Sequence, residues 1–192
     1  MLPSIPGINS SKVVLAWDVL ASKAMVGRKV VIVGGNAVGL ETALCLASQG
    51  TISPEVLHFL MVNKAESPDT MEQLLNRGNK EVYVVEMTKK VGQDIGNSTR
   101  WTVMAELKRL GVKTITGARA IEVTEVGLRI QKDAREELLS ADSIVIATGS
   151  KSENALASLK DLVAEIYVIG DAEKPRNALE AIREGFLFGI AI

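Results

Sequence analysis

Two glycines, Gly34 and Gly39, are spaced as in a phosphate-binding turn. The segment Gly34-Gly35-Asn36-Ala37-Val38-Gly39 follows a strand-like run, residues 29–33, and leads into a segment of helical character. The N-terminus of a helix presents unpaired N–H groups and a positive dipole end to an anion. A buried strand before the turn and a helix after it are typical of the pyrophosphate-binding corner of a dinucleotide fold. The alternative is a glycine turn that only packs the helix against the strand.

Asn36 departs from the G-x-G-x-x-G fingerprint, because it stands where the second glycine lets the backbone approach the pyrophosphate closely. Asparagine tolerates a positive φ better than most residues, so we expect the turn to survive. Its side chain either donates a hydrogen bond to a phosphate or crowds it. The sequence leaves both possibilities open.

Glu86 is placed to select the nucleotide, because it lies at the end of a predicted strand. In a dinucleotide fold an acid at this point accepts hydrogen bonds from ribose hydroxyls, usually about 20 residues after the glycines. Glu86 follows Gly39 by 47 residues, and a predicted helical insertion at 51–79 accounts for the excess. The alternative is an ordinary strand-end acid. A carboxylate here favours NADH by repelling the 2′-phosphate of NADPH, an inference that Lys89 and Lys90 weaken.

The elements that position these residues alternate as in a parallel sheet with helical crossovers. Apolar runs predict buried parallel strands at 29–33, 81–87, 112–116 and 141–148. Apolar spacing predicts helices at 14–22, 37–48 and 98–110. Ser-Pro pairs at 53–54 and 67–68 have the form of a helix N-cap followed by proline. They predict a helical hairpin inserted at about 51–79, a surface feature or partner contact.

The spacing of the apolar residues changes after residue 118. Short alternating runs predict an antiparallel meander of strands at 119–124, 127–131 and 136–140. A further buried strand at 165–172 and a closing helix at 178–188 complete the chain. The fold class is therefore α/β, a Rossmann-like parallel sheet with flanking helices and a small antiparallel β-meander.

Several side chains are expected to pack inside. They are Trp17 and Leu20 on the first helix, the stripe Trp101, Met104, Leu107 and Leu110, and the single cysteine, Cys45. The single histidine, His58, is expected to pack in the core or to be partly exposed. Packing is favoured for Cys45 over a reactive thiol and for His58 over catalysis. One cysteine and one histidine exclude an intrachain disulfide, a Ser-His-Asp triad and a multi-histidine metal site. We predict no metal ligand and no catalytic residue.

Composition bounds the class of protein. The chain has 192 residues, of which 47% are hydrophobic, and a net charge of −1. These values indicate a soluble globular α/β protein without the basic excess of a nucleic-acid-binding domain. No apolar run reaches the roughly 20 residues of a membrane span, and no signal peptide is recognised. We expect a cytoplasmic protein with no nucleic acid or membrane partner.

Three segments together resemble the flavoproteins that carry two dinucleotide-binding domains. They are the stretch from Gly34 to Ala43, Ala-Thr-Gly-Ser at 147–150, and Tyr-Val-Ile-Gly-Asp-Ala at 167–172. Pro3-Ser-Ile-Pro-Gly-Ile8 and Ala181-Ile-Arg-Glu-Gly-Phe186 narrow the resemblance to multidomain relatives of old yellow enzyme. These are the 2-enoate reductases, 2,4-dienoyl-CoA reductases and trimethylamine dehydrogenase. The likeness covers essentially the whole chain, and the insertion at 51–79 is most similar to the 2-enoate reductase branch.

The resemblance implies a domain organisation and partners. Residues 1–150 would form an NAD(P)H-binding domain, and 151–192 would be the C-terminal segment of an interrupted FAD-binding domain. The parent protein would carry FAD, with FMN and an iron–sulfur cluster on a barrel outside this chain. The chain would then be a fragment that partners the remainder of its own polypeptide, or pairs with a second copy.

The resemblance also implies site residues. The turn Gly34 to Gly39 would hold the pyrophosphate of NADH or NADPH, and Glu86 the ribose. Glu41 would lie near the nicotinamide, with a solvated helix residue as the alternative. The strand-end residues Ala147, Thr148 and Gly149 would line the cleft, and Gly170 and Asp171 would face FAD.

The function implied is transfer of hydride from NAD(P)H to a flavin in a flavin-dependent oxidoreductase, for which the isolated fragment is expected to be inactive. Two alternatives stay open, a stand-alone nucleotide-binding module without catalysis and an interaction module that docks through the inserted helices. The substrate of the parent enzyme is not specified by any of these residues.

Overall fold

The computed structural model describes residues 3–162 and 165–191, and the chain divides into two compact units between Thr148 and Gly149. The division lies next to the boundary expected at residue 150. Each unit is described by itself below.

The first unit is built on a five-stranded parallel sheet in the order β1-β8-β2-β3-β4. The strands are β1 (Val13–Leu15), β2 (Lys29–Val33), β3 (Glu81–Glu86), β4 (Lys113–Thr116) and β8 (Ser143–Ile146). Four of them confirm the predicted strands. Because β2, β3 and β8 are central, they are buried on both faces, which is why their sequences are apolar runs without alternation.

The edge strand β1 is a difference from the sequence prediction, which began a helix at Val14. Val13 to Leu15 pair with Ile144 to Ile146 of β8, and helix α1 (Ala16–Leu20) follows directly. Leu15 has extended backbone angles, φ −84° and ψ 144°, at the helix N-cap. A three-residue strand that runs into a helix without a turn residue carries no sequence signal that separates the two.

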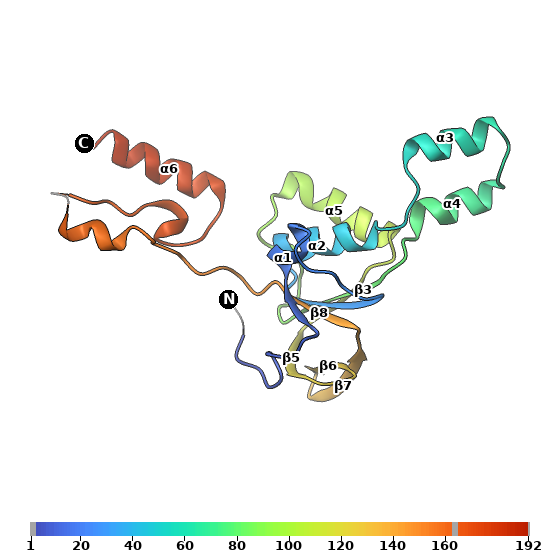
Figure 1. Cartoon of the computed structure of the whole chain (residues 1–192), viewed down its shortest axis with the longest axis horizontal. Helices are drawn as coiled ribbons and strands as arrows, with labels where there is room; N and C mark the ends of the chain where they lie inside the picture. The colour runs from blue at the N-terminus through green and yellow to red at the C-terminus, as the bar shows by residue number, and fades with distance from the viewer. Residues whose placement is uncertain (1–2, 163–164, 192) are drawn as a thin grey trace. The chain divides into compact units, whose positions relative to one another are not determined.

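The sheet separates two hydrophobic cores. Figure 1 shows helices on one face of this sheet and the meander on the other. On one face, side chains such as Val30 and Val84 pack against α1, α2 (Ala37–Ala47) and α5 (Asn97–Arg109). On the other face, Val31 and Ile144 pack against a three-stranded antiparallel meander. Its strands are β5 (Ala118–Val123), β6 (Gly127–Lys132) and β7 (Arg135–Ser140). The expected Rossmann-like sheet with a small meander is confirmed.

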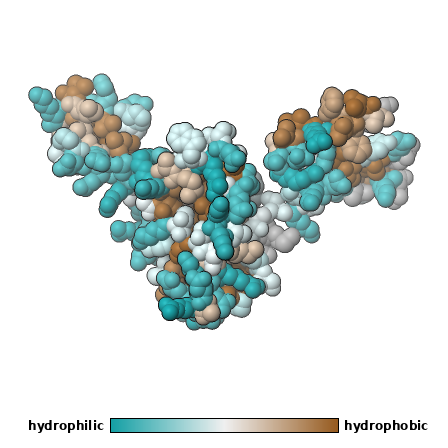
Figure 2. Space-filling model, turned by 180° about the vertical axis from the view of Figure 1, so that it is seen from behind, coloured by the Kyte–Doolittle hydropathy of each residue, from teal (hydrophilic) through white to brown (hydrophobic). Residues whose placement is uncertain are grey.

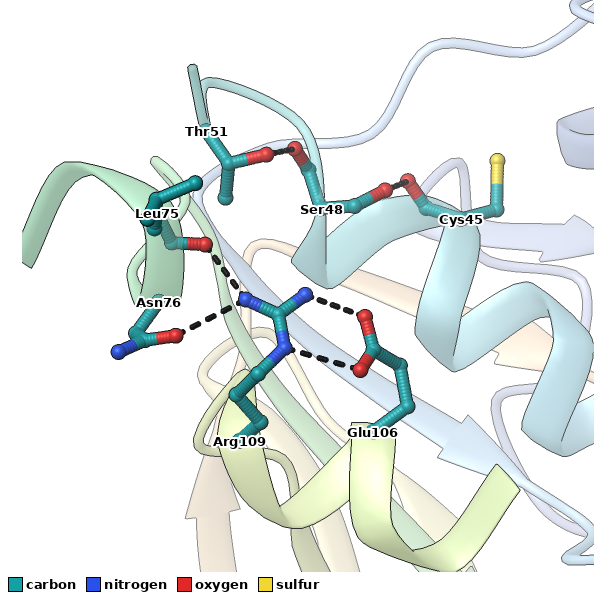
Figure 3. A network of polar contacts seen from close by, with 7 residues as sticks. All are labelled: Cys45, Ser48, Thr51, Leu75, Asn76, Glu106 and Arg109. Atoms are coloured by element: carbon teal, nitrogen blue, oxygen red, sulfur yellow. Dashed lines mark hydrogen bonds and ion pairs between the residues drawn. The ribbon is translucent and has the colours of Figure 1, made fainter. Parts of the chain in front are cut away.

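The inserted hairpin forms as predicted, from α3 (Pro54–Val62) and α4 (Pro68–Asn76). Ser53 and Ser67 cap the two helices through their side-chain oxygens. Arg109 of α5 holds the base of the hairpin, donating from Nη1 to the Leu75 carbonyl at 2.7 Å and to Asn76 Oδ1 at 2.9 Å (Figure 3). The same guanidinium bonds Glu106 and holds the pKa of that carboxyl below its ordinary value.

Three burial predictions, for Trp17, Trp101 and Cys45, were wrong, because these residues are exposed. His58, expected in the core or partly exposed, is also exposed. In the α5 stripe Leu107 and Leu110 are buried, but six residues separate Trp101 from Leu107, which places it about 120° around the helix. Cys45 lies one turn after the exposed Glu41, on the outer face of α2.

The second unit contains two short 3₁₀ helices, η1 (Ala157–Asp161) and η2 (Gly170–Ala172), and helix α6 (Ala178–Gly189). The strand predicted at 165–172 is absent from the described residues 165–169, which have no strand assignment. A parallel strand needs a neighbour for its N–H and C=O groups, and the described residues of this unit form no strand. Tyr167 instead lies against Phe188 of α6, with ring centroids 5.4 Å apart.

Candidate functional site

The turn after β2 depends on Gly34 for its shape. Gly34 has φ +107°, a conformation that L side chains rarely adopt, and a Cβ there would lie 2.4 Å from the Ala147 carbonyl oxygen. Its N–H donates to the Val85 carbonyl at 2.9 Å. The turn is therefore fixed between the C-terminal ends of β3 and β8.

Gly39 brings helix α2 into contact with this turn. A Cβ at Gly39 would lie 2.0 Å from the Gly34 carbonyl oxygen, much closer than any side-chain carbon tolerates. The two glycines of the fingerprint therefore have complementary roles. Gly34 forms the turn, and Gly39 lets the helix approach it. The N-terminus of α2 consequently points at the end of the sheet where open parallel folds bind ligands.

Asn36 does not use the positive φ that the sequence suggested for it. It is the N-cap of α2, with φ −85° and ψ −174°, its side chain makes no capping hydrogen bond, and it is exposed. The turn survives because its strained residue is Gly34, and an extended residue of any type fits at position 36. The exposed amide is available to a ligand at the helix terminus.

The backbone N–H groups of the turn divide into used and unused donors. Gly35 donates to Glu86 Oε2 at 2.7 Å, and Ala37 donates to both carboxylate oxygens of Asp94, at 2.9 and 3.1 Å. Within residues 3–162 and 165–191, no hydrogen bond is donated by the N–H groups of Asn36, Val38 or Gly39. Three N–H donors at the positive end of an eleven-residue helix therefore have no acceptor within the described residues.

Glu86 is tied to the turn rather than pointing freely into solvent. The residue is 8% exposed. Oε2 accepts from the Gly35 N–H and Oε1 accepts from the N–H of Thr88 at 2.8 Å. Each carboxylate oxygen has a second lone pair, so both can still accept a hydroxyl. The sequence predicted that Glu86 and the glycine turn lie in one site. In the structure they are in contact through the hydrogen bond from the Gly35 N–H to Glu86 Oε2.

Asp94 is the site residue that sequence analysis missed. It lies in the loop after β3, and its carboxylate reaches the first N–H of α2 although 57 residues separate them. The signal available was only an acid near Gly92 and Gly96, which is common in turns. Its position follows from the parallel sheet, which brings the loop after β3 beside the loop after β2.

The other predicted residues are divided between the units. In the first unit Ala147 is at the end of β8 beside the turn, Thr148 is exposed, and Glu41 is on the exposed face of α2. Gly149 belongs to the second unit, as do Gly170 and Asp171 of η2.

In η2 the Gly170 N–H and one carboxylate oxygen of Asp171 are already partnered. Gly170 N–H donates to Glu184 Oε2 at 2.7 Å, and Asp171 Oδ1 accepts from Arg176 N–H at 3.2 Å. The Arg176 guanidinium and then the Gly170 N–H hold the pKa of Glu184 below its ordinary value. These contacts stabilise the turn itself.

Residues 1–185 match the family described as pyridine nucleotide-disulphide oxidoreductase. The chain belongs to this family. The resemblance drawn from the glycine turn and the two downstream segments is thereby confirmed at the level of the family, and the fold agrees with it.

Two relatives are reductases. A metal reductase of Desulforamulus reducens is 41% identical over 185 residues, which are 96% of this chain and 28% of the relative. A cinnamate reductase of Clostridium sporogenes is 29% identical over 178 residues, 91% of this chain and 22% of the relative. A solved 2-naphthoyl-CoA reductase complex superposes with a TM-score of 0.76 at 26% identity, covering 99% of this chain and 25% of its own.

The chain thus spans about a quarter of the length of the relatives that it matches. It is homologous to oxidoreductases within the pyridine nucleotide-disulphide oxidoreductase family. In the described part of the chain, no helix combines the length and apolar character needed to cross a membrane.

Proposed function

We propose that this chain is the NAD(P)H-binding part of a flavin-dependent oxidoreductase, 2-enoate-reductase-like, in which hydride passes from NAD(P)H to a flavin. The observation that carries the proposal is the helix α2 N-terminus. It offers three N–H donors without an acceptor in the described residues, directly beyond a glycine turn and beside the buried Glu86. Membership of the pyridine nucleotide-disulphide oxidoreductase family supports the same reading.

The residues present fit a dinucleotide. The pyrophosphate would accept from the N–H groups of Asn36, Val38 and Gly39, with the Asn36 amide at the rim. The adenosine ribose would donate to the Glu86 carboxylate, whose bonds to Gly35 and Thr88 fix its orientation. The bound nicotinamide supplies the hydride, and the chain supplies binding and orientation.

NADH is the nucleotide favoured by this arrangement. A 2′-phosphate at the ribose position would meet the Glu86 carboxylate, which is already fixed by two backbone N–H groups. Lys89 and Lys90 are exposed on the following loop, where they are the groups that would support NADPH.

The second unit does not fit FAD by itself. Its Gly170 N–H and Asp171 carboxylate are engaged within the unit, and the N-terminus of α6 is capped by Asn177, whose Oδ1 accepts from Glu180 N–H at 3.0 Å. We assign to this unit one part of an FAD-binding domain that the rest of the parent polypeptide would complete.

Binding of NADH is expected in the millimolar range, because the N–H groups of one turn supply most of the contacts. NADH fluorescence titrated with protein should rise and saturate, and NADPH should bind more weakly. Added free FMN, monitored at its visible absorbance under anaerobic conditions, tests whether bound NADH also passes its hydride on. Absence of an NADH signal at millimolar concentrations would contradict the proposed function.

A second candidate function, an interaction module, is favoured by exposed apolar faces. On α6 the residues Leu179, Ile182 and Phe186 are 65–70% exposed and lie at helical spacing. Figure 2 shows hydrophobic residues gathered on this unit. On α3 no residue is buried, and Phe59 and Met61 are exposed. Such faces are typical of surfaces that another polypeptide covers.

Self-association of the isolated chain is expected, since α6 exposes a contiguous apolar face. Size-exclusion chromatography with light scattering should give a mass that rises with protein concentration. Ile182→Ser combined with Phe186→Ser should restore a monomer, whereas Arg183→Ser on the same helix should not. If Phe59→Ser alone abolishes association, the hairpin and not α6 is the contact surface.

A further inference from the structure

Asp94 occupies one of the donors that the proposed pyrophosphate site would use. Its two carboxylate oxygens lie 2.9 and 3.1 Å from the N–H nitrogen of Ala37, the first residue of α2. This carboxylate has the same sign of charge as a pyrophosphate and uses the same kind of contact, an anion on a helix N-terminus. It therefore covers part of the anion site in the nucleotide-free chain.

The loop that carries Asp94 is attached to the turn on its other side. Val91 is buried, and its carbonyl accepts from Arg100 Nη2 at 2.7 Å. Gly92 donates its N–H to the Gly35 carbonyl at 2.7 Å. Asp94 itself is exposed, so its side chain can leave Ala37 by rotation while the loop backbone keeps these contacts.

The charge of Asp94 is not neutralised by a neighbouring cation. Among the ion pairs of the described residues, none includes Asp94. Its compensation comes from the Ala37 N–H and the helix dipole. A pyrophosphate entering the turn would meet a carboxylate without a cationic partner within the same anion site, and repulsion falls only when that side chain moves away.

We propose that Asp94 is an internal competitor for the pyrophosphate site, which a bound dinucleotide must displace and which thereby lowers nucleotide affinity. This inference rests on the proposed function. Displacement releases the Ala37 N–H, so the anion then has four donors, from residues 36 to 39, in place of three. Asp94 stabilises the empty turn and is a residue that sets affinity, not one that touches the reacting atoms.

The test is an NADH titration of the whole chain and of Asp94→Asn and Asp94→Ala. Asparagine keeps an acceptor for the Ala37 N–H but loses the charge, so helix capping is preserved. Both variants should bind NADH about tenfold more tightly than the unchanged chain, and inorganic pyrophosphate should compete more strongly in them. Asp69→Asn, which removes the same charge from the first turn of α4, is the matched control and should leave the affinity unchanged.

The outcomes separate this inference from the proposed function. If the unchanged chain binds NADH and Asp94→Asn binds it equally or more weakly, the competitor role is overturned and Asp94 is only a helix cap. If neither the unchanged chain nor the variants bind NADH, the proposed function and the competitor role are both overturned. Tighter NADH binding by Asp69→Asn would indicate a general effect of net charge on affinity and would also overturn the competitor role.

Discussion

Gly39→Ala is expected to destabilise the first unit by about 3 kcal/mol and to abolish detectable NADH binding. The added Cβ would lie 2.0 Å from the Gly34 carbonyl oxygen, a backbone atom of the turn itself. Neither partner is a flexible side chain that could move aside. The helix must withdraw from the turn, and its N–H groups then leave the position in which they face an anion. Urea unfolding followed by circular dichroism, with NADH fluorescence on the folded fraction, measures both effects.

Gly96→Ala is the matched control for that substitution. Gly96 is the N-cap of α5, and a Cβ there meets nothing closer than 3.9 Å. Loss of a glycine cap costs about 1 kcal/mol or less, so this variant should stay folded and bind NADH normally. A Gly39→Ala variant as stable as Gly96→Ala would mean that the close approach of α2 to the turn is not required.

Glu86→Ala is expected to weaken NADH binding at least tenfold and to remove the preference for NADH over NADPH. The substitution removes the acceptor of the ribose hydroxyls and also the charge that repels a 2′-phosphate. It leaves the buried Gly35 N–H without its acceptor, with a stability cost of about 2 kcal/mol. NADH and NADPH are titrated separately, and the ratio of their dissociation constants is compared with that of the unchanged chain. A loss of stability weakens the binding of both nucleotides alike, whereas the loss of the charge changes the ratio.

Two further variants sharpen the Glu86 measurement. Glu86→Gln retains an acceptor oxygen and should keep most of the stability while still losing discrimination between the nucleotides. Glu125→Ala removes the same charge from the exposed turn between β5 and β6 and should change neither affinity. An unchanged NADH-to-NADPH ratio in Glu86→Ala would exclude Glu86 from the site and direct attention to Lys89 and Lys90.

The central part of the fold was predictable because its signals are local. Lys29 to Val33 is a buried apolar run that ends at glycines, and the two Ser-Pro pairs mark the starts of α3 and α4. The long spacing in sequence between Gly39 and Glu86 was also predictable, since the inserted hairpin accounts for it. In each case a few neighbouring residues determine the element.

Other features depend on partners that a single segment does not reveal. Residues 165–169 have the apolar composition of a strand, yet they form none, because strand formation requires a neighbour to pair with. Trp101 is a residue type that often occupies a core. A spacing of three residues falls short of a full helical turn, however, so Trp101 lies away from the buried face of α5. Residue type alone favoured the interior in both cases.

Asp94 was missed for a related reason. Its partner, Ala37, lies 57 residues earlier, and only the pairing of β2 with β3 brings the two loops together. The positive φ expected at Asn36 was wrong because Gly34 already supplies the reversal of the chain. The finer arrangement of donors at the turn is therefore a property of the folded sheet.

The most direct measurement of the central claim is a protein-detected NMR titration of the whole chain with NADH. The dinucleotide site predicts that the amide signals of Gly34, Gly39 and Ala37 shift progressively up to millimolar NADH. The amide signal of Gly127, at the start of β6 in the meander, should stay in place. Shifts confined to residues outside the turn, or no shift at all, would contradict the assignment of this turn as the nucleotide site.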